Sequence, residues 1–221
     1  MKKTILLLLG LVFILTGCTK TNDTSLLFKK DYEALNGKTN KNGIKYRTVN
    51  ISEDNPYIIV EASDIVKKIE NKETFYVYFG DDLCPWCRSV IEKSIEVANI
   101  NKIDKIYYVA IWDDDGNEIL RDKFTLENGK PVKTIEGTDT YSKLLTYFHD
   151  VLSNYNLKDS EGNPITTGEK RIFAPNFIYV EKGKPIKMID GISDKQKDSR
   201  EKLTSEILED EENQFNKFFK N

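Results

Sequence analysis

The residues best suited to chemistry are two cysteines separated by two residues, Cys84-Pro85-Trp86-Cys87. The apolar run 74–79 precedes them and an amphipathic segment, 88 to about 100, follows, which predicts a strand, a short loop and a helix. Cys84 then lies at or just before the helix N-terminus, where free N–H groups and the positive end of the helix dipole stabilise a thiolate. Cys87 follows one turn later, close enough to form a small disulfide. In this context the spacing predicts reversible dithiol chemistry.

The composition permits a well-packed core and excludes one class of partner. The chain has 221 residues, of which 39% are apolar and 11% aromatic, enough for one domain with an insertion or an N-terminal arm. Its formal net charge of -3 provides no basic field. Nucleic acid is therefore not expected as a partner.

The first residues predict export and lipidation. Lys2 and Lys3 precede an apolar stretch, 5–15, that is too short to span a bilayer comfortably, and Leu15-Thr16-Gly17-Cys18 follows. This pattern resembles the lipobox of bacterial lipoproteins. The resemblance implies that a signal peptide, 1–17, is removed and that Cys18 receives a diacylglyceryl group and a further acyl chain such as palmitate. Two or more chains would anchor the protein to the extracytoplasmic face of the cell membrane. The alternative is an ordinary secretory signal with an incidental cysteine.

The cysteine count supports the redox interpretation. The chain has three cysteines, and lipidation of Cys18 leaves Cys84 and Cys87 as the only pair. A single pair at a helix start in an exported protein is expected to be redox-active rather than structural.

The polar segment 18–43, rich in Lys, Asn and Thr, is predicted to be a lipidated tether with no more than a weak helical turn near Phe28 and Tyr32. The domain is expected to occupy residues 44–221. A loose alternation at 44–51 suggests a first strand. Further strands at 57–60, 74–79 and 106–112 alternate with helices, which predicts α/β organisation with parallel strand pairs.

A long stretch from about 113 to 173 interrupts this pattern and is interpreted as an insertion. It is predicted to contain a hairpin at 124–135, a helix from 139 to about 154 and a loop at 159–168. The segment 126–137 resembles 180–191, and Pro175 directly precedes the second of these. The second hairpin is therefore assigned to the main sheet, followed by a charged helix from about 194.

Together these features resemble the thioredoxin superfamily, over roughly residues 57–220. The resemblance implies a three-layer α/β/α fold with a mixed sheet and an insertion before a cis-proline, Pro175, that faces the disulfide. Within the superfamily, the segments around Cys84-Pro85-Trp86-Cys87 and 170–175 are most similar to the bacteriocin-transport-accessory group. Two departures from thioredoxin itself are the Pro85-Trp86 dipeptide and Tyr78, which stands where thioredoxin has a buried aspartate. The group that accepts a proton from the resolving thiol is therefore either missing or supplied by another residue.

By this resemblance the protein is expected to be a thiol-disulfide oxidoreductase acting on protein thiols, with an unidentified redox partner and no cofactor. Cys84 would be an exposed attacking thiolate and Cys87 the resolving thiol, with Trp86 shielding the sulfurs. Arg88 would either add positive charge nearby or be a solvated helix residue. The alternative function is a non-catalytic binding or export-accessory module. Metal delivery is not expected, because two thiols and His149 fall short of the four ligands that zinc prefers.

Overall fold

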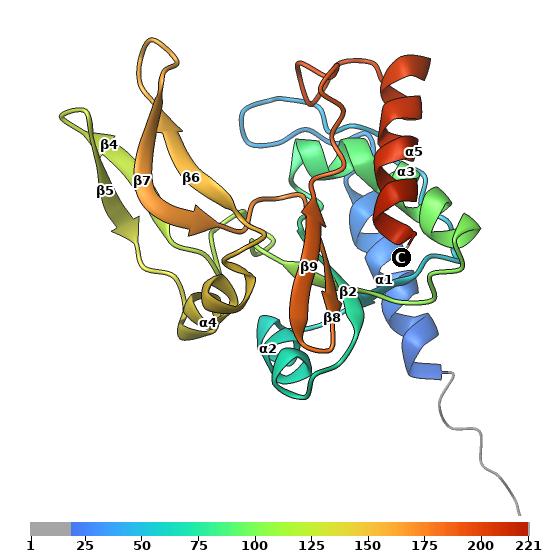
Figure 1. The fold of residues 1–221 in the computed structure, drawn as a ribbon. Coiled ribbons are helices and arrows are strands. Elements are labelled where there is room, and N and C mark those ends of the chain that lie inside the picture. The colour runs from blue at the N-terminus through green and yellow to red at the C-terminus, as the bar shows by residue number, and fades with distance from the viewer. Residues whose placement is uncertain (1–18, 221) are drawn as a thin grey trace, which may run out of the picture.

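The computed structural model describes residues 19–220 (Figure 1). The predicted signal peptide and Cys18 lie outside the described residues, so export and lipidation remain predictions. Within 19–220, no helix combines the length and the apolar character needed to cross a bilayer.

The centre of the fold is a five-stranded mixed sheet. Its strand order is β1-β3-β2-β8-β9, in which β1, β3 and β2 run parallel and β8 runs antiparallel to both of its neighbours, β2 and β9. The strands span Tyr57–Ile59 (β1), Phe75–Gly80 (β2), Ile106–Ala110 (β3), Asn176–Glu181 (β8) and Lys184–Ile189 (β9). The predicted assignment of the second hairpin to the main sheet is confirmed, because β8 pairs with β2.

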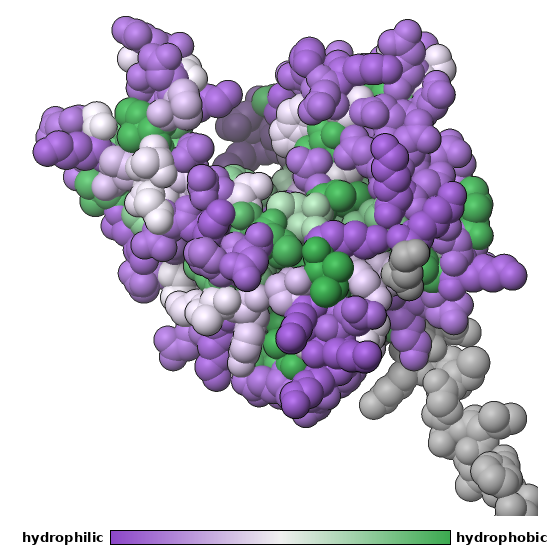
Figure 2. All heavy atoms as spheres, in the orientation of Figure 1, coloured by the Kyte–Doolittle hydropathy of each residue, from purple (hydrophilic) through white to green (hydrophobic). Residues whose placement is uncertain are grey.

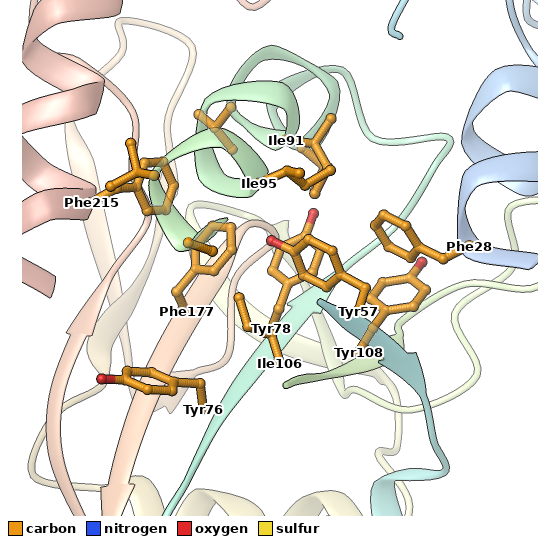
Figure 3. Close-up of a cluster of buried hydrophobic side chains, with 14 of the residues drawn as sticks. Phe28, Tyr57, Tyr76, Tyr78, Ile91, Ile95, Ile106, Tyr108, Phe177 and Phe215 are labelled. Atoms are coloured by element: carbon orange, nitrogen blue, oxygen red, sulfur yellow. The ribbon is translucent and has the colours of Figure 1, made fainter. Parts of the chain in front are cut away.

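Helices cover both faces of this sheet. One face packs against α1 (Thr19–Ala34), α3 (Pro85–Ile100) and α5 (Ser205–Phe219), the other against α2 (Ala62–Glu70) and α4 (Asp139–Phe148). Successive side chains of a strand point to opposite faces. Tyr76 and Tyr78 therefore enter the first core (Figure 3). Val77 and Phe79 enter the second. The predicted three-layer α/β/α fold with a mixed sheet is confirmed.

The predicted tether at 18–43 is wrong, because most of it belongs to the folded domain. Helix α1 occupies this segment, and the side chains of Phe28 and Tyr32 are completely buried. Phe28 stacks on Tyr57 of β1, with ring centroids 4.4 Å apart (Figure 3). Phe28 and Tyr32 are one helical turn apart and lie on the same face of α1, and their burial holds this helix against the sheet. The domain begins within α1 rather than at residue 44.

The insertion consists of two hairpins that protrude from the domain and of helix α4, which packs on the same face of the central sheet as α2. Two separate two-stranded sheets protrude, built from β4 (Lys123–Glu127) with β5 (Lys130–Ile135) and β6 (Ser153–Lys158) with β7 (Pro164–Arg171). We call these four strands and their turns the arm (Figure 1). Helix α4 lies between the two hairpins in sequence and packs against α2 instead.

Several predicted boundaries are corrected. Helix α4 ends at Phe148, and the segment predicted to complete it consists of a turn, 149–152, and the first residues of β6. The predicted loop at 159–168 contains the start of β7. Helix α5 begins at Ser205 rather than near residue 194. The segment 44–51 contains no named strand and makes only an isolated bridge, between Thr39 and Lys45.

Candidate active site: a buried dithiol at a helix N-terminus

The two cysteines lie where the sequence predicts, at the N-terminus of α3. Cys84 is the N-cap residue, Pro85 begins the helix, and the backbone N–H of Cys87 donates to the Cys84 sulfur over 3.3 Å. Proline suits the first helical position because its missing N–H would have no partner there. The arrangement directs free helix N–H groups at the sulfur of Cys84.

The environments of the two thiols separate their pKa values. A hydrogen bond from the Cys87 thiol, and further bonds from the backbone N–H groups of Cys87 and Trp86, lower the pKa of Cys84. Burial raises the pKa of Cys87 well above its usual value. Cys84 is therefore the thiol that ionises first and can attack, and Cys87 is suited to resolve the mixed disulfide.

Cys84 is not exposed as predicted, since only 3% of its surface is accessible. Its thiol lies 3.5 Å from the carbonyl oxygen of Ala174, to which it donates, and Trp86 and Ala174 pack against the same core cluster. The Ala174-Pro175 peptide bond is cis, as the resemblance implies. The loop before β8 therefore lies directly against the sulfur and shares in covering it.

Tyr78, in the place where thioredoxin has an acid, is hydrogen-bonded to the resolving thiol. Its hydroxyl bonds to the Cys87 thiol and lies 2.9 Å from the hydroxyl of Tyr32, which also approaches the carbonyl oxygen of Asp81 at 3.3 Å. Tyr78 and Tyr32 are both fully buried, and burial raises the pKa of each phenol well above its usual value. Both phenols therefore stay neutral, and that of Tyr78 can donate to a Cys87 thiolate.

Asp81 is a candidate site residue that the sequence reasoning missed. The residue is only 2% exposed, and its carboxylate accepts from the backbone N–H of Leu83 at 3.0 Å and of Trp112 at 3.1 Å. Burial, with the charge of Asp82, raises the pKa of Asp81 to about 7. Its charge in turn raises the pKa of Cys84. An available signal was an acid placed at the end of a buried strand, three residues before the first cysteine.

Arg88 is not the solvated helix residue of the second prediction, because it is completely buried. Its guanidinium donates to the carbonyl oxygens of Arg47, at 2.6 and 2.8 Å, and of Tyr32, at 2.8 Å. It also donates to the Asp82 carbonyl oxygen at 3.2 Å and to the side-chain oxygen of Asn36 at 3.0 Å. Arg88 thus fastens α1 and the segment after it to the helix that carries the cysteines.

A cluster of buried ion pairs joins the arm to the active-site loop. Arg121 pairs with Glu118 at 2.7 Å and donates to the carbonyl oxygen of Ile172 at 3.1 Å, three residues before Pro175. Arg171 pairs with Asp122 at 3.4 Å. Because charged groups are costly to bury without partners, these contacts fix the arm in one position at its base.

Metal binding finds no support in the part of the chain that the structure describes. His149 lies on the surface and contacts only its neighbour Asp150, with 66% of its side chain exposed. Residues 19–220 contain no group of three or more His, Cys, Asp or Glu side chains placed to hold a metal ion.

Comparison with known proteins adds only a distant likeness in structure. A scan against protein-family profiles and a search of curated proteins each found no match. Among solved structures, the chain is similar to oxidised thioredoxin O2 from Arabidopsis thaliana, with 10% identity over 63% of this chain and 85% of that one and a TM-score of 0.31. It is also similar to the J-Trx1 fragment of ERdj5, with 21% identity over 58% of this chain and 69% of that one and a TM-score of 0.25. Both neighbours are thioredoxin-fold proteins.

Proposed function

We propose that the protein is a membrane-anchored, extracytoplasmic thiol-disulfide oxidoreductase that acts on protein thiols through Cys84 and Cys87. The observation that carries the proposal is the position of the Cys84 sulfur at the N-terminus of α3, where it accepts a hydrogen bond from the backbone N–H of Cys87 over 3.3 Å. Helix N–H groups at this position stabilise a thiolate, and they lower the pKa of Cys84. Cys87 follows one helical turn later, where it can resolve a mixed disulfide.

In the reductive direction, the Cys84 thiolate attacks one sulfur of a substrate disulfide. The substrate S–S bond breaks, a mixed disulfide to Cys84 forms, and the other substrate sulfur leaves as a thiolate. Cys87 then loses its proton and attacks the Cys84 sulfur. This second exchange forms the Cys84-Cys87 disulfide and releases the remaining substrate thiol, so two electrons pass to the substrate. The reverse sequence oxidises a substrate dithiol, and the relative redox potentials decide the direction.

The activity is tested by insulin reduction in the presence of dithiothreitol, with wild type, Cys84→Ser and Cys87→Ala compared. We expect Cys84→Ser to abolish turnover. In a separate reaction, with reduced protein and no dithiothreitol, we expect Cys87→Ala to accumulate a mixed disulfide with insulin that mass spectrometry detects. Turnover by Cys84→Ser equal to wild type would refute the assignment. Wild type that binds partners without exchanging disulfides would favour the non-catalytic accessory module.

The location is tested separately. Support for lipidation is the sequence pattern that ends at Cys18. We expect Cys18→Ser to abolish labelling by radioactive palmitate and to move the protein from the membrane fraction to the soluble fraction. Unchanged labelling and fractionation would contradict the lipid anchor and leave the redox proposal standing.

A further inference from the structure

A groove lies beside the dithiol, between the body of the domain and the arm. Its volume is about 440 Å³. The body contributes Trp86, Pro175 and Met188 to its lining, and strand β6 of the arm contributes Asn154 and Asn156. Figure 2 shows a notch on this face between the arm and the rest of the molecule. One wall of the groove is thus the active-site loop itself, and the facing wall comes from the insertion.

The arm wall is held in place by buried contacts. The guanidinium of Arg171 lies 4.2 Å from the ring centroid of Tyr155, the residue of β6 between Asn154 and Asn156. Arg171 also pairs with Asp122, and Tyr155 is itself buried. Because the Arg171 guanidinium is ion-paired and also lies over the Tyr155 ring, it restrains strand β6, to which that ring belongs. The groove therefore exists before any ligand arrives.

The chemistry of the lining favours a neutral, extended polypeptide. Apolar side chains from the body face amide side chains on the arm, and amides both donate and accept hydrogen bonds, as a peptide backbone does. Among the described residues that line the groove, none is Lys or Arg, and the single charged one is Asp190. A low-mass thiol that carries carboxylates would need a cation here, so charge complementarity disfavours it.

We propose that strand β6 is a substrate-binding wall, and that an extended, uncharged stretch of polypeptide flanking a substrate cysteine binds between β6 and the Ala174-Pro175 loop. Asn154 and Asn156 determine affinity by bonding to the backbone of that stretch. This inference rests on the proposed function, since it describes how a protein substrate reaches Cys84. The groove is continuous with the loop whose carbonyl oxygen lies 3.5 Å from the Cys84 sulfur.

The first test compares two substrates across the Asn154→Ala/Asn156→Ala double variant. One is a disulfide-bonded peptide with uncharged residues beside its cysteine, and the other is hydroxyethyl disulfide, which is too small to reach β6. We expect KM for the peptide to rise about tenfold, as the loss of one or two ordinary hydrogen bonds predicts, with kcat unchanged. The rate with hydroxyethyl disulfide should match wild type. Ser160→Ala, an exposed position of the arm outside the groove, is the matched control.

The second test needs no redox chemistry. A fluorescent version of the peptide with serine in place of cysteine is titrated into wild type and the double variant, and binding is followed by anisotropy. We expect the double variant to bind about ten times more weakly. Equal binding by both proteins overturns the inference, as does an equal loss of activity on both disulfides. Absence of exchange activity in wild type together with weakened peptide binding by the variant would refute the proposed function but not the groove.

Discussion

The hydroxyl groups of Tyr32 and Tyr78 lie 2.9 Å apart, which places a residue of the N-terminal helix within one hydrogen bond of the tyrosine that contacts Cys87. The side chain that hydrogen-bonds to the resolving thiol is therefore the phenol of Tyr78, and Tyr32 supports that phenol in turn. The acid of this site, Asp81, approaches from the end of β2. These two features lead to separate predictions.

Tyr78→Phe should slow the resolving step. The Tyr78 hydroxyl stabilises the Cys87 thiolate by donating to it, so its removal raises the pKa of Cys87 further and lowers the thiolate fraction. A hydrogen bond to a charged group contributes about 1.5–3 kcal/mol, so we expect the mixed disulfide to decay about tenfold more slowly or more, with its formation unchanged. Stopped-flow kinetics with mass-spectrometric quenching would measure both steps.

Tyr57→Phe is the matched control for that experiment. Tyr57 is equally buried in the same aromatic cluster, but its hydroxyl is paired with Ser94 at 2.7 Å rather than with a thiol. If the two variants resolve the mixed disulfide at the same rate, Tyr78 has no specific role in the exchange.

Asp81→Asn should simplify the titration of Cys84. Asp81 ionises as the pH rises through about 7, and its negative charge then opposes the Cys84 thiolate. In wild type, the rate of Cys84 alkylation by iodoacetamide should therefore rise with pH in a broadened transition with an inflection near pH 7. In the variant we expect a single transition at lower pH, because the opposing charge is absent.

Asp64→Asn, which alters a surface carboxylate paired with Lys67 on α2, should leave the alkylation profile unchanged. A profile for Asp81→Asn that superimposes on wild type would show that the Asp81 charge does not reach the sulfur.

Phe28→Ala should destabilise the whole domain. Phe28 is fully buried against Tyr57 and Tyr108, with ring centroids 4.4 and 5.0 Å away, and truncating a buried phenylalanine typically costs about 3–5 kcal/mol. Leu27→Ala changes the neighbouring residue of the same helix, which is 45% exposed, and should shift stability by no more than about 0.5 kcal/mol. Urea unfolding measures both. Equal stability of the two variants would mean that α1 is not part of the cooperative unit.

Glu211 should make stability depend on pH in the neutral range. This α5 residue is fully buried, its carboxyl oxygens have no hydrogen-bond partner, and burial raises its pKa from 4.5 to about 8. Arg47 and Lys93 partly offset this rise, while Asp210 adds to it. Because the folded state favours the neutral form, the stabilising contribution is complete below pH 4.5 and is lost as the pH rises to about 8.

Glu211→Gln removes this titration. We expect wild type and variant to have similar unfolding free energies at pH 4 and the variant to be more stable at pH 9, by on the order of 2–4 kcal/mol. Glu209→Gln, an exposed change on the same helix, should follow wild type throughout. Parallel stability curves for wild type and Glu211→Gln would show that folding does not change the pKa of Glu211.

The central sheet and the dithiol could be predicted from the sequence because their signals are local. The buried run ending at Phe79 and the cysteine pair next to a helical pattern are contiguous, and Pro175 directly precedes its hairpin. Helix α1 could not be predicted in the same way, because Phe28 and Tyr32 are buried while the neighbouring Leu26 and Leu27 are exposed. Its stability comes from tertiary packing rather than from a strong apolar stripe.

The missed site residues depend on contacts between distant segments. In the sequence, Asp81 resembles an ordinary acidic turn residue. Its carboxylate accepts a hydrogen bond from the backbone N–H of Trp112, which lies 31 residues later in the chain. Arg88 looks like a solvated helix residue because its main partners are backbone carbonyl oxygens, which carry no side-chain signature in a sequence. Burial of a charge against backbone groups is a property of the folded chain alone.

The burial of α1 also determines where this chain can be shortened for laboratory use. A version that started at residue 44 would remove the rings of Phe28 and Tyr32 from the core and two oxygen acceptors, on Tyr32 and Asn36, from the Arg88 guanidinium. Tolerance of truncation follows from the burial and bonding of what is removed, not from distance to the active site. A shortened form that keeps a native dithiol should therefore retain Phe28, Tyr32 and Asn36.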